Sequence, residues 1–61
     1  MNKVFEFNRL LKKADKYYSS KAYFIALDFI ESALRLEKTI SNRSLIEAYF
    51  LKSEIHQALG K

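Results

Sequence analysis

The chain has 61 residues, enough for a single domain over residues 1–61 and too few for a large core. Hydrophobic residues make up 49% of it, which excludes a disordered chain. The lack of cysteine excludes disulfide frameworks and thiolate zinc sites. The net charge of +4 lies entirely in residues 1–21, because residues 22–61 carry five acidic and five basic side chains.

A first helix is predicted from Lys3 or Asn8 to Tyr18. Its apolar side chains follow the i, i+3, i+4, i+7 rule and form one stripe: Phe7, Leu10, Leu11, Ala14, Tyr17 and Tyr18. The opposite side carries a basic face, which consists of Arg9, Lys12, Lys13 and Lys16. Ser20 then interrupts the pattern and is expected to be the N-cap of the next helix. So short a break predicts two antiparallel helices, an αα-hairpin.

The next segment, from Ala22 to Glu37, is expected to form a middle helix with neighbours on two sides. Apolar side chains cover more than half of its helical circumference, whereas a surface helix needs a stripe of only a little over about 100°. Ala26 and Ala33 lie near the centre of this apolar arc, where small side chains let another helix approach closely. Phe24 is left on the exposed side.

Polar residues 38–43 are expected to form the connection to a third helix. Ser44 and Glu47 have the spacing of a capping box, so this helix is predicted to follow Ser44. It is expected to end near Leu59, with Gly60 in the left-handed position that comes next. The core-facing stripe of this helix is Leu45, Ala48, Tyr49, Leu51, Ile55 and Leu59. Pointing the other way is an i, i+4 pair, Ile46 and Phe50.

The predicted fold is all-α, a three-helix antiparallel bundle in which an αα-hairpin packs against a C-terminal helix. The sequence also contains an internal repeat with an interval of 39 residues. Four positions correspond in it: Leu10, Lys13, Ala14 and Tyr17 match Tyr49, Lys52, Ser53 and His56. The pattern Leu10-x2-Lys13-Ala14-x2-Tyr17, then Ala26-x3-Ile30, resembles the tetratricopeptide repeat. Residues 10–38 thus resemble one repeat, and residues 49–60 resemble the first helix of a second. The competing resemblance is to the microtubule-interacting-and-transport domain, another three-helix bundle with a basic first helix.

Tetratricopeptide proteins bind extended peptides or partner helices on a concave face lined by their first helices. This resemblance implies a set of partner-binding residues here: Leu11, Asp15, Tyr18, Phe50, Glu54 and Gln57. Ile46 joins this set because an exposed aliphatic–aromatic pair with Phe50 is typical of an interface. A homodimer through the third helices, with Phe24 at the margin, is also expected, since a repeat unit cannot bury its own face alone.

The leading functional prediction is a non-enzymatic protein–protein interaction module, a small cytoplasmic regulator or adaptor with a protein or peptide partner. No catalytic constellation is visible, and neither a metal nor a cofactor is expected around the sole histidine, His56. The alternative is a nucleic-acid-binding protein that uses the basic face, and DNA binding that weakens steeply with salt would identify it. No membrane association is expected, because no apolar run approaches the roughly 20 residues that span a bilayer.

Overall fold

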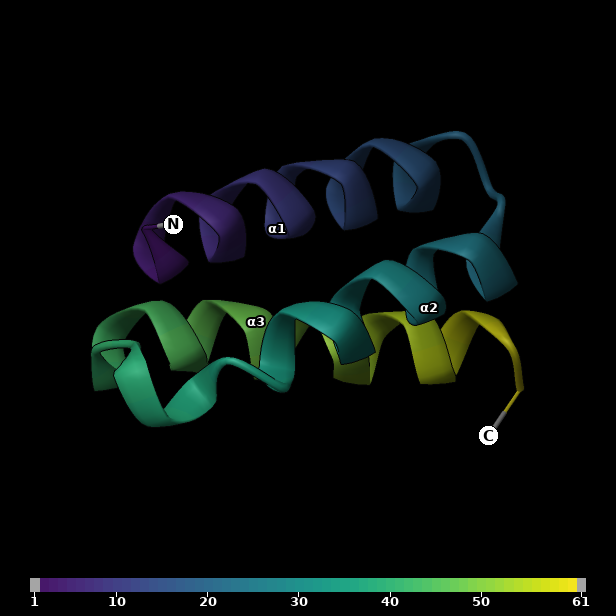
Figure 1. The fold of residues 1–61 in the computed structure, drawn as a ribbon. Helices are drawn as coiled ribbons and strands as arrows, with labels where there is room; N and C mark the ends of the chain where they lie inside the picture. The colour runs from purple at the N-terminus through teal and green to yellow at the C-terminus, as the bar shows by residue number, and fades with distance from the viewer. Residues whose placement is uncertain (1, 61) are drawn as a thin grey trace.

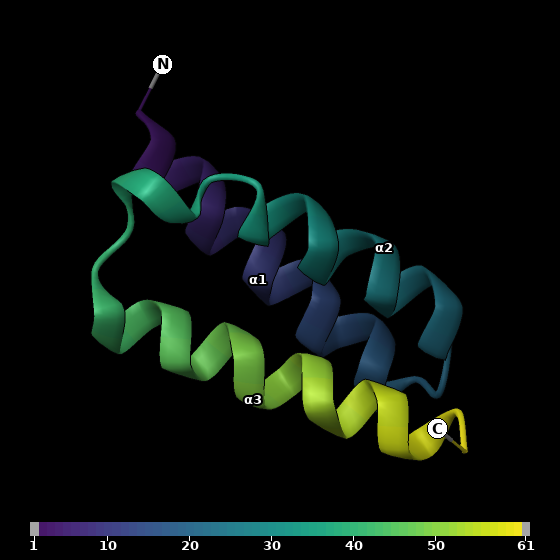
Figure 2. The ribbon, with the colours of Figure 1, turned by 90° about the horizontal axis from the view of Figure 1, so that it is seen from below.

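The computed structural model describes residues 2–60. They form three α-helices and one short 3-10 helix, in the order α1 (Lys3–Ser19), α2 (Tyr23–Leu34), η1 (Glu37–Thr39) and α3 (Asn42–Ala58). The helices run up, down and up, and α2 packs against both of the others (Figures 1 and 2). The predicted all-α three-helix bundle is confirmed.

The first helix begins at Lys3, the earlier of its two predicted starts, because Asn2 caps it. The Asn2 Oδ1 atom accepts hydrogen bonds from two backbone N–H groups of the first turn, at 2.9 and 3.2 Å. Glu6 lies in that turn, where a negative charge interacts favourably with the helix dipole. Its carboxylate forms an ion pair of 2.6 Å with the Arg9 guanidinium, and this hydrogen bond lowers the pKa of Glu6.

The turn between α1 and α2 is a Schellman motif with lysine in the place that glycine usually takes. The backbone N–H of Ala22 donates to the Tyr17 carbonyl at 2.9 Å, and that of Lys21 donates to the Tyr18 carbonyl at 3.0 Å. Lys21 therefore adopts a left-handed φ of 66°. The prediction of Ser20 as the N-cap of α2 is wrong, because the motif makes Ser20 the C-cap of α1.

Replacing Lys21 with glycine should stabilise the fold by about 0.5–1 kcal/mol. Glycine removes the roughly 1–2 kcal/mol of left-handed strain but gives the unfolded chain more freedom. Urea unfolding followed by circular dichroism measures the difference. The matched control is Ser20→Gly, where φ is −85° and there is no such strain to relieve, so this variant should lose stability. If both glycines shift the unfolding midpoint in the same direction, strain at Lys21 is not the cause.

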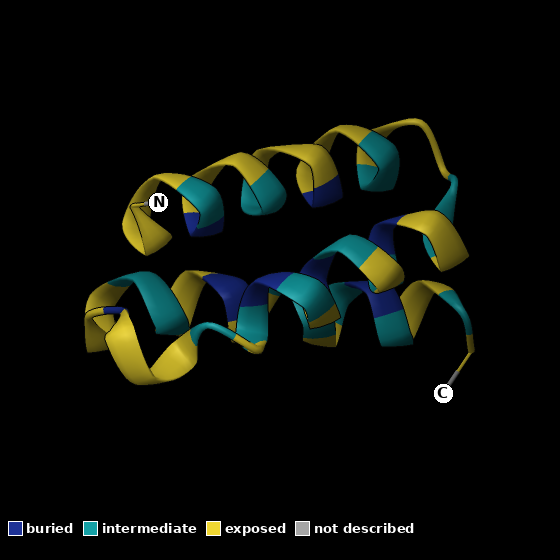
Figure 3. Ribbon diagram, in the orientation of Figure 1, coloured by how far each residue is buried: buried dark blue, intermediate teal, exposed yellow. Residues whose placement is uncertain are grey.

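Four alanines without exposed surface lie at the helix contacts: Ala14, Ala26, Ala33 and Ala48. The core is completed by larger side chains, which are Phe7, Ile30, Ile40 and Ile55. The buried residues lie on the sides of the helices that face one another (Figure 3). Because α2 supplies Ala26, Ile30 and Ala33 and packs against both other helices, its predicted place in the middle is confirmed.

Replacing Ala26 with leucine should destabilise the bundle by about 1–3 kcal/mol, because the larger side chain overpacks a contact that has no free space. The matched control is Ala58→Leu, which makes the same change at an exposed alanine of α3. Chemical denaturation of both variants provides the comparison. Equal unfolding midpoints for the Ala26 variant and the parent would show that α2 does not approach its neighbours closely at this position.

The start of α3 differs from the capping-box prediction by one helical turn. Ser41 is the N-cap, and its Oγ accepts a hydrogen bond from the Ser44 backbone N–H at 3.4 Å. Ser44 therefore lies inside the helix. The physical reason is Ile40, which is only 9% exposed and precedes the cap, while Leu45 packs against the same core from the fourth helical position. These are the two positions of a hydrophobic staple, which fixes where the helix begins.

The end of α2 also differs from the prediction, and this changes the environment of Tyr49. The helix ends at Leu34 rather than at Glu37, which lies instead at the start of η1. Tyr49 was expected in the core but is 48% exposed, and its hydroxyl donates to the Glu37 Oε1 at 2.6 Å. This hydrogen bond is the main cause of the raised pKa of Tyr49. The tyrosine therefore ties α3 to the connection instead of filling the core.

Candidate functional site

A groove of about 440 Å³ separates α1 from α3. Both helices pack on α2 and run in the same direction, but they contact each other only sparsely (Figures 1 and 2). The residues that line the groove are Leu11, Lys12, Asp15, Tyr18, Glu47, Phe50, Leu51 and Glu54. On α3 these positions follow the i, i+3, i+4, i+7 spacing of a single helix face. The groove thus extends over about two helical turns.

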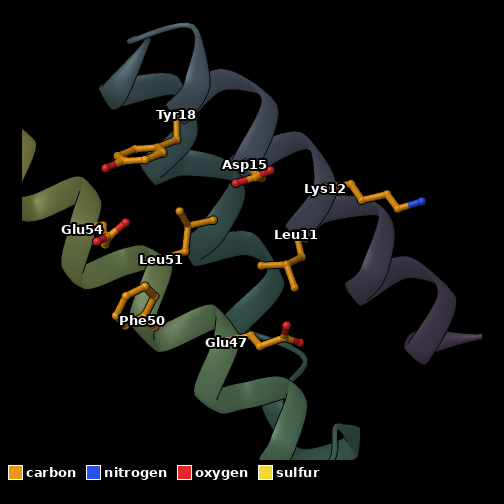
Figure 4. Close-up of a pocket in the computed structure, with 8 residues that line it drawn as sticks. All are labelled: Leu11, Lys12, Asp15, Tyr18, Glu47, Phe50, Leu51 and Glu54. Carbon is orange, nitrogen blue, oxygen red and sulfur yellow. The ribbon is translucent and has the colours of Figure 1, made fainter.

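The floor of the groove is apolar. Leu11 of α1 and Leu51 of α3 are both half-buried, pack against the core and point into the space between the two helices (Figure 4). Phe50 lies beside them and remains 65% exposed. An exposed phenyl ring next to an apolar floor provides a surface on which another hydrophobic side chain can be buried.

The charged residues around this floor are mainly acidic. Asp15 lines the groove from α1, and Glu47 and Glu54 line it from α3. Tyr18 lies next to Glu54, and the pKa of its phenol is raised, first by partial burial and then by the negative charge of that carboxylate. Among residues 2–60, Lys12 is the one basic side chain in the lining, and it extends along the outer side of α1, away from α3 (Figure 4).

Five of the seven predicted partner-binding residues meet in this groove: Leu11, Asp15, Tyr18, Phe50 and Glu54. The other two, Ile46 and Gln57, are exposed but lie outside the lining. Sequence reasoning missed Glu47 and Leu51 as groove residues. Glu47 lies three positions before Phe50, and Leu51 directly follows it. Leu51 was assigned to the core stripe, and it does contact the core while its remaining surface lines the groove.

The structure separates Phe24, expected at the margin of the dimer contact, from Ile46, which was expected with Phe50 on the contacting face of the third helix. Their side chains are 71% and 69% exposed. Because α2 and α3 are antiparallel, Phe24 at the start of α2 lies toward the C-terminal end of α3, whereas Ile46 lies in its first turns (Figures 1 and 2). Within one molecule they therefore belong to opposite ends of the bundle.

The basic face of α1 is exposed, but most of its cations interact with neighbours in the same molecule. Arg9 is bound to Glu6, as described above. The ammonium groups of Lys13 and Lys16 lie 5.8 and 5.6 Å from the ring centroids of aromatic side chains on α2 and α1, within cation–π range. Three of the four cations of the basic face therefore have an interaction partner within the same molecule.

Among residues 2–60, no three histidine, cysteine, aspartate or glutamate side chains come close enough together to hold a metal ion. None of the helices in this range is long and apolar enough to cross a membrane. No protein-family model, curated protein or solved structure matches the chain.

Proposed function

We propose that the chain is a non-enzymatic protein-interaction module, a small cytoplasmic regulator or adaptor that binds a peptide or a partner helix in the groove between α1 and α3. The observation that carries the proposal is the exposed apolar surface of the groove, formed by Leu11, Phe50 and Leu51 between two helices that hardly touch. Burying this surface against a partner would supply the hydrophobic free energy of binding.

The arrangement of the helices supports a tetratricopeptide-like reading of the chain. In that family the first helices of successive repeats line one face side by side, and α1 and α3 are the helices that match them here. The residues that the resemblance selects on these helices, Leu11 and Phe50 among them, border one groove. We keep the family as a proposal on this basis.

Selection of peptides from a displayed random library tests the groove. Enriched peptides should shift the amide NMR signals of groove residues, and Phe50→Ala should weaken their binding by about tenfold or more, since a central aromatic contributes on the order of 2 kcal/mol. Phe5→Ala is the matched control, because it removes a phenyl ring of similar exposure from α1, outside the groove. Fluorescence anisotropy gives the affinities.

Two outcomes would contradict the proposed groove function. One is an equal loss of affinity in the Phe50 and Phe5 variants, which would mean that the groove has no special role. The other is a selection whose peptides leave the groove signals unchanged, either because they bind elsewhere or because none is enriched.

We propose in addition that two copies pair through the exposed side of α3 around Ile46. If the two-fold axis is perpendicular to α3, the two α3 helices are antiparallel, and the C-terminal end of α3 in one protomer meets the N-terminal end of α3 in its partner. Phe24 of one protomer then approaches Ile46 of the other, although the two are distant within one chain. Pairing would cover two of the most exposed apolar side chains of the described residues.

Sedimentation equilibrium at micromolar concentration should show a dimer, and Ile46→Glu with Phe50→Glu should convert it to a monomer, because a charge at each position opposes burial. Ile46→Glu alone should have most of this effect while leaving the groove lining intact. A monomeric parent, or a dimer that survives the double change, would show that α3 is not the contact.

A further inference from the structure

The groove has a charge opposite in sign to that of the chain. The whole sequence carries +4. The groove lining contains three carboxylates and one ammonium group, which sum to −2. Of the seven acidic residues of the chain, Asp15, Glu47 and Glu54 are therefore gathered around one apolar floor. Such a local field attracts cationic partners and repels anionic ones.

The spacing of these carboxylates matches the dimensions of a helix. Glu47 and Glu54 are seven residues apart on α3, which is about two turns or 10.5 Å. Asp15 lies across the groove on α1, and the apolar side chains of Leu11 and Leu51 lie between the two acidic sides (Figure 4). A helix placed along this floor would turn one apolar stripe inward and hold the basic residues on its flanks near carboxylates on both sides.

An extended peptide suits the groove less well. Its backbone N–H and C=O groups would need hydrogen-bond partners when they become buried. The walls are α-helices, whose own backbone groups are already paired, and the lining contains no asparagine or glutamine side chain. A helical partner arrives with its backbone hydrogen bonds already satisfied.

We infer that the natural occupant of the groove is a cationic amphipathic helix, with aliphatic residues at i, i+3 or i+4, and i+7 and with lysine or arginine on both flanks. This inference rests on the proposed groove function and adds the chemical class of the partner. The outer face of α1 in a second copy does not fit this description, because the apolar residues of α1 already pack against the core of their own bundle.

Three synthetic helices of about five turns test the inference. The first combines an aliphatic leucine stripe with lysine flanks, the second replaces every lysine with glutamate, and the third scrambles the first so that the stripe is lost. The leucine–lysine peptide should bind at least about tenfold more tightly than either of the others, and its affinity should fall with added salt. Amide NMR shifts should map the bound peptide to the groove.

The variant D15N/E47Q/E54Q should weaken binding of the leucine–lysine peptide by about tenfold, because three rim ion pairs are lost. The matched control is D28N/E31Q/E37Q, which removes the same charge from carboxylates outside the groove and should keep most of the affinity. Circular dichroism verifies that both variants retain their helices. An unchanged affinity in the groove variant, or an equal loss in the control, would overturn the inference.

The three peptides also separate this inference from the function on which it rests. If the leucine–glutamate peptide binds in the groove as tightly as the lysine peptide, the cationic partner is wrong and the groove function stands. If none of the three peptides shifts the groove signals but library peptides do, the helical partner is wrong and the groove again stands. If no peptide of either kind reaches the groove, both proposals fail.

Discussion

The bundle depends on small, buried alanine side chains on all three α-helices. Four alanines are fully buried, and two of them, Ala26 and Ala33, belong to the middle helix. A methyl group at a crossing lets two helix backbones approach closely, so that the few larger residues can complete a dense core. A chain of 61 residues buries a smaller share of its apolar surface than a larger domain does, so its stability depends on this close packing.

This way of packing also explains why a groove is left open. The short turn after α1 makes α2 antiparallel to α1. The hydrophobic staple at Ile40 sets the start of α3, which is antiparallel to α2. α1 and α3 then share a neighbour and a direction without having to fill the space between them. The groove is a consequence of the order of the helices. Most of the side chains that line it are not needed to fill the core.

The sequence predicted the three helices, their antiparallel order and the middle position of α2, because hydrophobic periodicity reports directly on buried faces. The predicted helix ends were wrong where two local structures competed for the same residues. Ser20 and Ser44 both have the chemistry of an N-cap, but a Schellman turn and a hydrophobic staple outweighed them. The staple residue, Ile40, was hidden as a single apolar side chain in a polar segment.

Five groove residues coincide with positions that the repeat-like spacing selects on α1 and α3. Glu47 and Leu51 could not be selected in this way. A half-buried leucine has the same sequence signature as a core leucine, and an acidic residue on a helix is usually only solvated. Their role depends on how far α1 lies from α3, and that distance is a tertiary property absent from the periodicity.

The sparse contact between α1 and α3 has a consequence for stability as well as for recognition. A ligand in the groove would bridge two helices that are otherwise joined mainly through α2, so it would oppose any separation of α3 from the hairpin. Binding to the folded state alone adds RT ln(1 + [L]/Kd) to the free energy of unfolding, about 2.7 kcal/mol at 100 times Kd. For so small a domain that is a large fraction of the total. The pair of helices with the sparsest contact is the pair that an occupant of the groove would join, so binding there would lengthen the lifetime of the folded state.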